Sequence, residues 1–193
     1  MITAIVLAAG ESKRMGEPKM LLPWGKSTVL QTVISTLQAA NVKDILVVTG
    51  GEHQRVEALV GRTVEVIHNE NYKDGRMLSS IQLGLSAKKR EAEAALICLG
   101  DQPQVEERSV RGVCDAFQRT KSKLVVPSYE MRRGHPWLIA RGLWEDVLKL
   151  RAPKTMRDFL NRRANDILYV QCDTPTILQD LDTPEDYQKY RPQ

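Results

Sequence analysis

The sequence predicts a largely parallel, three-layer α/β domain, and two observations carry this prediction. Short apolar runs rich in Val, Ile and Leu alternate along the 193-residue chain with longer segments of helical periodicity. The apolar runs also lack polar residues at every second position, which indicates that helices cover both faces of the sheet. Strands that alternate with helices are typical of parallel sheets built from βαβ units.

The expected strands are the runs richest in aliphatic residues: Ala4–Ala8, Asp44–Thr49, Val64–Ile67, Ala94–Leu99, Lys123–Pro127 and Ile167–Gln171. The expected helices are Thr28–Ala40, Gln54–Val60, Met77–Ala87, Ser109–Arg119, Arg141–Leu150 and Thr155–Arg163. No repeat, low-complexity segment or Ser/Pro-rich linker interrupts this order, and the stretch 132–136 is expected to form a turn. A chain of this length suits one core, so we expect residues 1–193 to form a single domain.

Composition and charge exclude several classes of partner. The chain has 28 Lys and Arg against 24 Asp and Glu, a formal charge of +4 that is scattered along the sequence and suits a small anionic substrate. Only 5% of residues are aromatic, which argues against stacking on single-stranded nucleic acid. No apolar run approaches the ~20 residues that span a membrane, and no basic region precedes the apolar start. We therefore expect a soluble, cytoplasmic protein with no nucleic-acid or membrane partner.

The cysteines and histidines indicate neither a disulfide framework nor a zinc site. Three cysteines lie far apart without metal-ligand spacing, which is typical of reduced thiols: Cys98, Cys114 and Cys172. The three histidines, His53, His68 and His135, form no local cluster in the sequence.

The loop after the first expected strand is a candidate phosphate-binding loop. Ala8, Ala9 and Gly10 are small enough for a ligand to approach the backbone, and glycine permits a positive φ in a sharp turn. Arg14 and Lys19 follow, together with Lys13, and positive charge beside backbone N–H groups suits a triphosphate. In open α/β sheets, ligands bind beyond the carboxyl ends of the strands, where this loop must lie. A solvated basic turn is the alternative that these residues alone leave open.

Two better-known phosphate motifs do not fit. The dinucleotide fingerprint requires three glycines in a tight pattern, and only Gly10 and Gly16 are present. The tetrapeptide 24–27 resembles the end of a P-loop, but Met20 stands where the first glycine of that motif belongs and no strand precedes it.

Two aspartates follow apolar runs and could bind a metal ion. Asp101 comes directly after the run that ends at Leu99, and Asp182 follows a later apolar stretch. A magnesium ion bound with a nucleotide takes one or two carboxylates, and phosphate oxygens and waters complete its octahedron. An aspartate in such a place is also a common turn former or helix cap, and Asp182 could cap a helix over Thr183–Tyr190.

Several motifs in order resemble the nucleotidyltransferases with a Rossmann-like fold. They are Leu7-Ala8-Ala9-Gly10-x-Ser12-x-Arg14-Met15-Gly16-x-Pro18-Lys19, Gly100-Asp101-Gln102-Pro103, Gly134-His135-Pro136 and Asp180-Leu181-Asp182-Thr183-Pro184-Glu185-Asp186. The set spans nearly the whole chain and is most similar to the molybdenum cofactor cytidylyltransferases, because the guanylyl branch usually has Ala-Gly-Gly and Asp-Met-Pro in the first two motifs. The resemblance implies a three-layer α/β/α Rossmann-like fold with a mostly parallel, mixed sheet.

The resemblance also implies an enzyme that transfers CMP from CTP to the terminal phosphate of molybdopterin, releasing pyrophosphate. Mg²⁺ is the implied cofactor, with Mn²⁺ as an alternative, and a molybdenum enzyme is a candidate recipient of the product. By this resemblance Leu7, Ala8, Ala9, Gly10, Arg14, Lys19, Gly100 and Asp101 bind the nucleotide. Arg14, Lys19 and Asp101 act in catalysis, and Asp101 and Asp182 bind the metal.

The acceptor side is less well defined. Arg76, Ser79 and Ser80, near an expected helix start, could receive a phosphate or form a plain capped helix, and His135 could line the acceptor site or satisfy a turn. The sequence departs from the cytidylyltransferases at residues 150–157, where these enzymes often carry Gly-Asp-x-Gly-Ala-Arg. Another nucleotide, a sugar-phosphate acceptor, a non-catalytic accessory protein for molybdenum enzymes and a nucleotide-binding regulatory domain are the alternatives.

Overall fold

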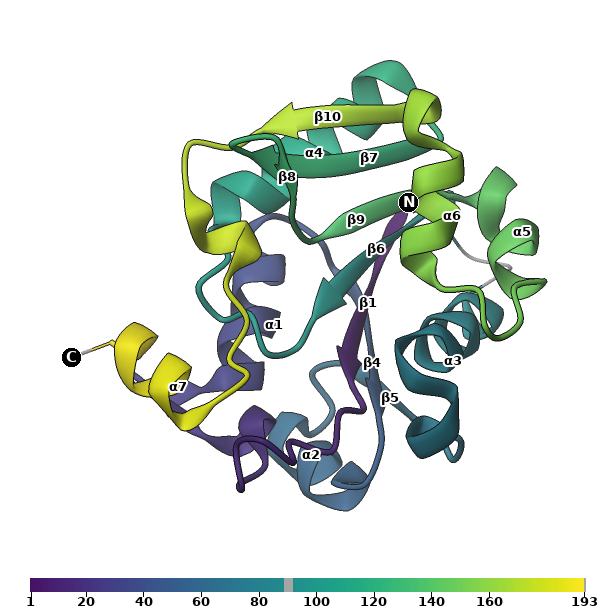
Figure 1. Ribbon diagram of the computed structural model, residues 1–193. Helices are drawn as coiled ribbons and strands as arrows, with labels where there is room; N and C mark the ends of the chain where they lie inside the picture. Colours follow the sequence, from purple (N-terminus) through teal and green to yellow (C-terminus); the bar gives the residue numbers. More distant parts are fainter. Residues whose placement is uncertain (89–91, 193) are drawn as a thin grey trace.

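The computed structural model describes residues 1–88 and 92–192, except for the side chains of residues 75 and 76. Within this part of the chain, eight strands form one sheet in the order β10-β7-β9-β6-β1-β4-β5, with β8 paired to β7 (Figure 1). Their bounds are β1 (Ile2–Ala8), β4 (Asp44–Thr49), β5 (Glu65–His68), β6 (Ala94–Leu99), β7 (Leu124–Tyr129), β8 (Arg132–Arg133), β9 (Trp137–Ala140) and β10 (Ile167–Gln171). Two further short strands, β2 (Pro23–Trp24) and β3 (Ser27–Thr28), form a separate hairpin.

The sheet is mixed and mostly parallel, which confirms the predicted fold class. β5, β4, β1 and β6 run parallel, and Leu7 of β1 lies between Val48 of β4 and Leu99 of β6. β9 runs antiparallel to both neighbours, β6 and β7, whereas β10 is parallel to β7. The carboxyl ends of β1, β4 and β6 therefore meet at one edge of the sheet, the lower edge in Figure 1.

Helices cover both faces of the sheet and complete three layers (Figure 1). On one face pack α1 (Val29–Ala39), α2 (His53–Val60) and α4 (Glu107–Thr120); on the other pack α3 (Tyr72–Ala87), α5 (Trp144–Leu148) and α6 (Met156–Arg162). β1 contributes to both cores, because Ala4 and Val6 point to the first face and Ile5 and Leu7 to the second. Burial on both faces explains why the strand sequences lack polar alternation.

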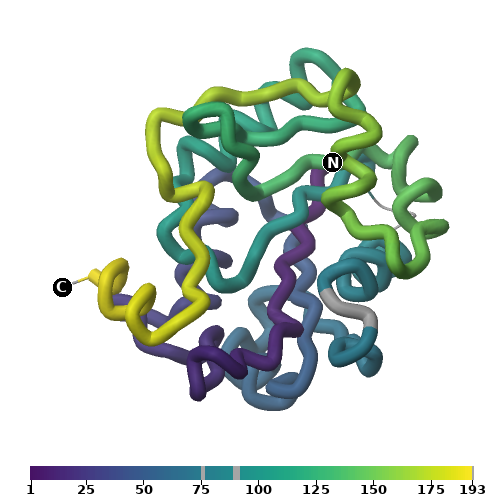
Figure 2. Tube along the Cα trace, in the orientation of Figure 1, coloured from purple at the N-terminus to yellow at the C-terminus, as the bar shows by residue number. Residues whose placement is uncertain are grey.

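The C-terminal helix α7 (Pro184–Tyr190) packs beside the first loop rather than on the sheet. Figure 2 shows this segment, in yellow, next to the purple N-terminal part of the chain. Tyr187 Oη donates a hydrogen bond of 2.6 Å to the Pro23 carbonyl, and Met15 and Leu181 share a small core with Trp24. The end of the chain is thereby held at the edge where β1 and β6 end.

The largest differences from the prediction lie in three regions. α3 begins at Tyr72 rather than Met77, and Gly75, a poor helix former, accounts for the late start that we predicted. The helix expected at 141–150 is divided into the 3₁₀ turn η2 (Arg141–Leu143) and α5. The turn expected at 132–136 contains β8 and leads into β9, a short strand that the sequence analysis missed. The remaining 3₁₀ turns are η1 (Lys19–Leu21), η3 (Ala164–Asp166) and η4 (Pro175–Leu178).

The three cysteines are unpaired in the structure. Burial raises the pKa of the Cys98 thiol well above its usual value and that of Cys114 to about 11, so both remain protonated at neutral pH.

No helix in the described part of the chain is long and apolar enough to cross a lipid bilayer.

A buried ion-pair cluster fixes the opposite edge of the sheet and gives a first testable prediction. Lys88 Nζ lies 2.9 Å from Asp44 Oδ1 and 2.7 Å from Glu65 Oε2. Burial alone would lower the pKa of Lys88, but the hydrogen bonds and charges of Glu65 and Asp44 outweigh it and raise the pKa. We expect Lys88→Met to lower the free energy of unfolding by about 3 kcal/mol, because it strands the partly buried Asp44 carboxylate. Urea denaturation measures this, and Lys43→Met, at an exposed neighbouring position, should change little.

Candidate active site

Four charged side chains converge where β1 and β6 end. Lys19 Nζ lies 3.0 Å from Asp101 Oδ2 and 2.9 Å from Asp182 Oδ1. Arg14 Nη2 lies 3.0 Å from the other carboxylate oxygen, Oδ2, of Asp182. The structure thus brings together residues from three distant segments that we selected as metal and phosphate ligands. A single ammonium group stands between the two aspartates, where a divalent cation would have to lie.

Asp101 is held by its neighbours in the sheet. It directly follows β6, and the preceding Gly100 N donates a 3.0 Å hydrogen bond to the Leu7 carbonyl of β1. A Cβ at Gly100 would come within 2.9 Å of that same carbonyl oxygen and of Met20 Sδ, so the position requires glycine. Gly100, which we predicted as a nucleotide-binding residue, therefore has a packing role that its sequence context did not reveal.

Asp182 is not the helix cap that the sequence left open. Thr183 caps α7, and its hydroxyl and the Asp186 carboxylate form a reciprocal capping box. Asp186 Oδ2 also accepts a 3.3 Å hydrogen bond from Asp182 N, and Leu181 N donates 3.1 Å to the Asp101 carbonyl. Because these bonds fix the backbone on both sides of Asp182, its carboxylate is left to face Lys19 and Arg14.

Ser12, which we did not select, organises the loop that carries Lys19. Its hydroxyl accepts a 3.1 Å hydrogen bond from Lys19 N, and its carbonyl accepts from Met15 N and Gly16 N at 3.0 and 3.1 Å. A positive φ in this loop, which we expected of glycine, is found at Gly16 (φ 76), and Ser12 (φ 52) also adopts it. The Ser-x-x-x-Gly spacing was the sequence signal for this turn.

The small residues at the end of β1 leave different amounts of space for a ligand. The side chains of Leu7 and Ala8 are buried in the two cores, so only their backbone could face a nucleotide. Gly10 is exposed, and no atom lies within 4 Å of where its Cβ would be. Gly50, at the end of β4, approaches so closely that a Cβ there would lie 2.6 Å from the Ala9 carbonyl oxygen. Ala9 and Gly10 are therefore the most accessible part of this segment.

The charges at this site are mutually stabilised. Burial opposes the charged form of Lys19, but Asp101 and Asp182 outweigh it and raise the pKa of Lys19. Burial likewise opposes the charge of Asp182, yet Lys19 and Arg14 lower the pKa of Asp182. At neutral pH Lys19 is therefore a cation and Asp182 an anion.

A third carboxylate, Asp180, belongs to the site and was not selected from the sequence. Desolvation of its carboxyl, and then the negative charges of Asp101 and Asp182, raise the pKa of Asp180 to about 6. The sequence signal was its position two residues before Asp182, which we read only as part of a motif. Within the described residues, no group of three or more His, Cys, Asp or Glu side chains is arranged to hold a metal ion.

The raised pKa of Asp180 gives a pH-dependent prediction. A carboxyl whose pKa is higher in the folded than in the unfolded protein stabilises the fold below the unfolded pKa of about 3.9, and this contribution is lost as the pH rises through about 6. We therefore expect Asp180→Asn to raise the unfolding temperature relative to wild type at pH 7.5 but not at pH 4. Calorimetric scans in chelator test this, and an equal difference at both pH values would contradict it.

The structure does not bring together the three predicted acceptor residues whose side chains it describes, Ser79, Ser80 and His135. Ser79 and Ser80 lie in the middle of α3, not near its start, so the expected phosphate site at a helix N-terminus is wrong. Asn69 Nδ2 donates 2.9 Å hydrogen bonds to both serine hydroxyls, and Ser80 is buried. The side chain of Arg76 lies outside the described part of the structure.

Ser79 lines a polar groove between α3 and the segment after α5. The groove has a volume of about 490 Å³, and its other lining residues are Asn69, Asn71, Gln82, Leu83, Ser86, Leu148 and Arg151. Gln82 Nε2 donates to the carbonyls of Leu148 and Leu150 at 3.3 and 3.0 Å and fixes the width of the groove. Because Asn69 and Asn71 follow β5, one end of the groove opens at the same sheet edge as Asp101.

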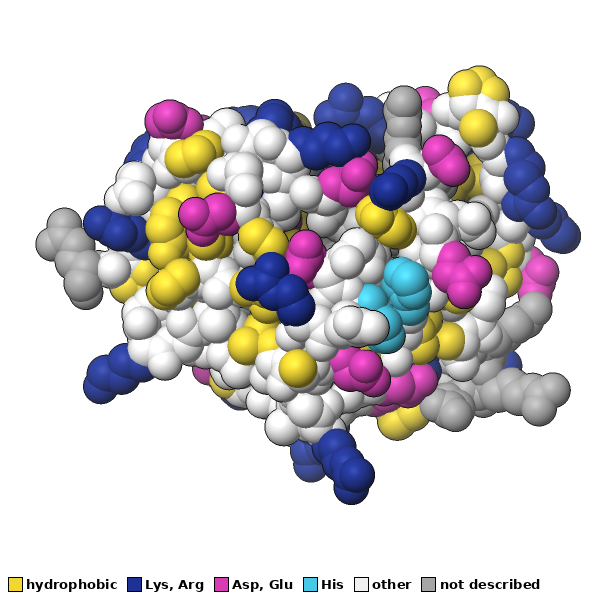
Figure 3. Space-filling view, turned by 90° about the horizontal axis from the view of Figure 1, so that it is seen from below, with side chains coloured by type: hydrophobic (Ala, Val, Ile, Leu, Met, Phe, Trp, Pro, Cys, Tyr) yellow, Lys and Arg dark blue, Asp and Glu magenta, His cyan; other side chains and the backbone are white. Residues whose placement is uncertain are grey.

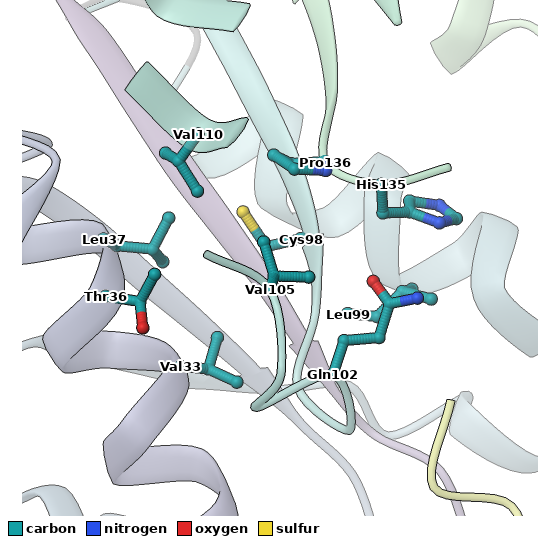
Figure 4. A pocket seen from close by; sticks show the side chains of 10 residues that line it. All are labelled: Val33, Thr36, Leu37, Cys98, Leu99, Gln102, Val105, Val110, His135 and Pro136. Atoms are coloured by element: carbon teal, nitrogen blue, oxygen red, sulfur yellow. The ribbon is translucent and has the colours of Figure 1, made fainter. Parts of the chain in front are cut away.

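His135 lies in a different, mostly apolar cavity on the opposite face. Figure 4 shows it with Gln102 beside side chains of α1 and α4, around a cavity of about 20 Å³. Its ring stacks on Trp137 with centroids 4.1 Å apart, and burial lowers the pKa of His135 to about 3. A neutral imidazole in this place cannot provide a positive charge for a phosphate.

Figure 3 looks onto the sheet edge where β1, β4 and β6 end, and basic and acidic side chains lie next to one another there. Histidine side chains gather at one place on this face. His53 and His68, which form no local cluster in the sequence, stack with ring centroids 4.8 Å apart, where α2 begins and β5 ends. The mixture of charges suits a bound cation together with an anionic ligand better than a uniformly basic surface would.

Comparison with known proteins agrees with this arrangement. The chain is 29% identical over 189 residues to the molybdenum cofactor cytidylyltransferase of Escherichia coli (strain K12), covering 96% of this chain and 93% of that protein. It is 27% identical to the nicotine blue oxidoreductase of Paenarthrobacter nicotinovorans, covering 98% and 95%. A protein of Mycobacterium tuberculosis H37Rv, solved in complex with manganese, superposes with a TM-score of 0.79 at 27% identity, covering 97% and 96%.

The family model for the MobA-like NTP transferase domain matches residues 4–168. That range contains the first loop, Asp101 and every strand of the large sheet, with β1 and β10 matched in part. The segment with Asp180, Asp182 and α7 lies beyond it. The match extends over most of the chain, and it includes the first loop with Lys19 and the strand end with Asp101. This chain therefore belongs to the MobA-like NTP transferase family, as a nucleotidyltransferase.

Proposed function

We propose that this chain transfers CMP from CTP to the terminal phosphate of molybdopterin, the organic part of the molybdenum cofactor, and releases pyrophosphate. The observation that carries the proposal is the placement of Lys19 between Asp101 and Asp182, directly beyond the loop that follows β1. The full-length similarity to a cytidylyltransferase supports the choice of reaction. The tripeptides Ala8-Ala9-Gly10 and Asp101-Gln102-Pro103 resemble those of the cytidylyl branch and support CTP as the nucleotide substrate.

Asp101 and Asp182 would hold Mg²⁺, or Mn²⁺ in its place. The fit rests on their convergence on one cationic group at 3.0 and 2.9 Å, because two carboxylates already placed around an ammonium can exchange it for a metal ion. When bound, the ion supplies positive charge that neutralises the phosphates of the substrate. Lys19, displaced from the carboxylates, remains close enough to bind a phosphate oxygen, and Arg14 extends the positive charge along the loop.

The reaction needs little proton chemistry from the protein. An oxygen of the acceptor phosphate forms a bond to the α-phosphorus of CTP, and the bond from that phosphorus to the bridging oxygen of pyrophosphate breaks. The second pKa of a phosphate monoester is about 6, so the nucleophile is already mostly deprotonated at neutral pH. The neutral His135 therefore need not act as a base. The barrier is the approach of two anions, which Lys19 and Arg14 lower by positioning and neutralisation.

For the acceptor, we propose the polar groove beside α3. Of the predicted residues, Ser79 keeps this role because it lines the groove, whereas Ser80 is buried and bonded to Asn69 and His135 stacks on Trp137 in another cavity. Arg151 in the groove wall is a cation able to bind an anionic group of the acceptor. We further propose that the chain acts as one domain in the cytoplasm and passes its product to a molybdenum enzyme.

A nucleotide and acceptor screen tests this function. The protein is incubated with Mg²⁺, each of CTP, GTP, ATP and UTP, and either molybdopterin or glucose 1-phosphate, and pyrophosphate is measured. We expect release with CTP and molybdopterin together, and little with any other pair. Release with another pair would replace the proposed substrates, and tight molybdopterin binding without release would support an accessory role. Consumption of NADH or NADPH with no pyrophosphate would instead place the chain with its oxidoreductase relative.

A further inference from the structure

The side chain of Gln102 links two segments of the candidate site, and the proposed reaction gives this residue no role. It follows Asp101 and is only 3% exposed. Its Nε2 donates a 2.6 Å hydrogen bond to Asp180 Oδ1 and lies 3.5 Å from the Ile177 carbonyl oxygen. The side chain therefore reaches from the loop after β6 to the segment that carries Asp182.

The contact at Ile177 brings a third segment into the same junction. His135 N donates a 3.0 Å hydrogen bond to the Ile177 carbonyl. A Cβ at Gly134 would lie only 2.5 Å from that oxygen, so the β8–β9 connection packs tightly on η4. The loop after β6, the start of β9 and the chain before Asp182 thus meet at one point.

A buried glutamine at this position is not explained by packing alone. In the described part of the chain, Gln102 Oε1 and His135 Nε2 are buried without a hydrogen-bond partner. Both residues line the cavity of about 20 Å³ seen in Figure 4, which has room for about one water molecule between such groups. An apolar side chain of similar size would avoid burying an unpaired amide oxygen. The feature that only the amide provides is the N–H donated to Asp180.

Three carboxylates at one place need to be kept in order. Asp101, Asp180 and Asp182 are like charges close together and repel one another. Gln102 donates a hydrogen bond to Asp180 and holds that carboxylate at a fixed point. The other two carboxylates, those of Asp101 and Asp182, form the ion pairs with Lys19. The backbone hydrogen bond from Leu181 N to the Asp101 carbonyl also holds these two segments together.

We propose that Gln102 is a positioning residue that anchors Asp180 and thereby sets the geometry of the cation site formed by Asp101 and Asp182. This deepens the proposed function and rests on it only for the turnover measurement. Gln102 touches neither substrate nor metal, and it acts through the segment 180–182. The β8–β9 connection at His135 meets the same junction through the Ile177 carbonyl.

The central test exchanges the donor and the acceptor of this hydrogen bond. Gln102→Glu keeps the size of the side chain but places a second carboxylate against Asp180, so we expect kcat to fall by about 10²-fold through misplacement of the site. The Mn²⁺ affinity of the nucleotide-free protein, measured by calorimetry, should fall as well. Asp180→Asn alone keeps the hydrogen bond, because its amide oxygen can still accept from Gln102, and it measures separately the effect of removing the Asp180 charge.

The double variant Gln102→Glu with Asp180→Asn restores the bond, with the introduced amide now donating to the introduced carboxylate. We expect it to recover most of the lost metal affinity and rate, a non-additive result that a general effect of charge does not produce. Gln179→Glu is the matched control, since it adds the same charge beside Asp180 without touching the Gln102 bond. It should leave the Mn²⁺ affinity within about twofold of wild type, as expected for a partly exposed charge.

Gln102→Met covers the case in which the buried glutamate prevents folding, because it removes the donor without adding charge. It should also weaken Mn²⁺ binding while the unfolding temperature stays close to wild type. The proposal is overturned if Gln102→Met binds Mn²⁺ like wild type, or if the double variant is no better than Gln102→Glu. Since Mn²⁺ binding needs neither CTP nor acceptor, an enzyme that turns over other substrates would overturn the proposed function and leave this result intact.

Discussion

Asp101→Asn is expected to lower pyrophosphate release by about 10³-fold, equivalent to about 4 kcal/mol of transition-state stabilisation. The amide keeps the shape of the side chain but removes one of the two negative charges that would hold the metal ion. Lys19 keeps its contact with Asp182, so we expect the fold to persist.

Steady-state pyrophosphate release with CTP, Mg²⁺ and molybdopterin measures this effect, and thermal unfolding checks the fold. Asp115→Asn is the matched control, because Asp115 is exposed on α4 and distant from the lysine–aspartate cluster in sequence and fold. Wild-type rates in Asp101→Asn would remove Asp101 from the metal site. Equal losses of rate in Asp101→Asn and Asp115→Asn would show that the rate depends on the net charge of the protein and not on the position of Asp101.

Lys19→Met is expected to lower the affinity for CTP and to raise the affinity for Mn²⁺. The variant loses the cation that would contact the triphosphate, so CTP affinity and turnover should each fall by about 10²-fold, as for the loss of a preorganised charge in an active site. The nucleotide-free protein should bind Mn²⁺ more tightly than wild type, because Lys19 no longer neutralises Asp101 and Asp182.

Calorimetry with CTP and, separately, with Mn²⁺ resolves the two effects. Lys13→Met provides the control, since Lys13 lies in the same loop but its side chain is 77% exposed and pairs only with Glu11 among the ion pairs found in the described residues. If Lys19→Met and wild type bind CTP equally, the loop does not hold the triphosphate. If Mn²⁺ affinity falls instead of rising, Lys19 does not occupy the cation position.

Much of the fold could be predicted because the central strands are buried on both faces. The bounds of β4 and β6 agree with the runs that we selected, since burial forces a continuous aliphatic sequence there. The bounds of β10 also agree, although it is an edge strand with partly exposed residues. β9 could not be found in this way: it has four residues, it follows the proline at 136, and it is paired antiparallel between two longer strands. The turn between β7 and β8 contains Glu130 and Met131, both with positive φ, in place of the glycine or asparagine that marks such turns, so the hairpin was not found either.

The site was predictable where the chemistry lies in local motifs and not where it depends on distant contacts. Lys19, Asp101 and Asp182 each belong to a motif, and the structure brings them within hydrogen-bonding distance. The roles of Gln102 and Asp180 depend on a contact between residues 78 positions apart, which the sequence does not show. For the acceptor, the late start predicted for α3 placed Ser79 at a helix end, and a mid-helix position changes what its hydroxyl can bind.

The most direct test of the lysine–aspartate site is a metal titration of pyrophosphate release with CTP and molybdopterin, in wild type and in Asp101→Asn. The wild-type protein should release no pyrophosphate in chelator and should reach a saturating rate as Mg²⁺ or Mn²⁺ is added. Asp101→Asn should need a much higher metal concentration and reach a far lower rate. Release in chelator, or the same metal dependence in both proteins, would contradict the account of this site as a metal-dependent nucleotidyl transfer centre.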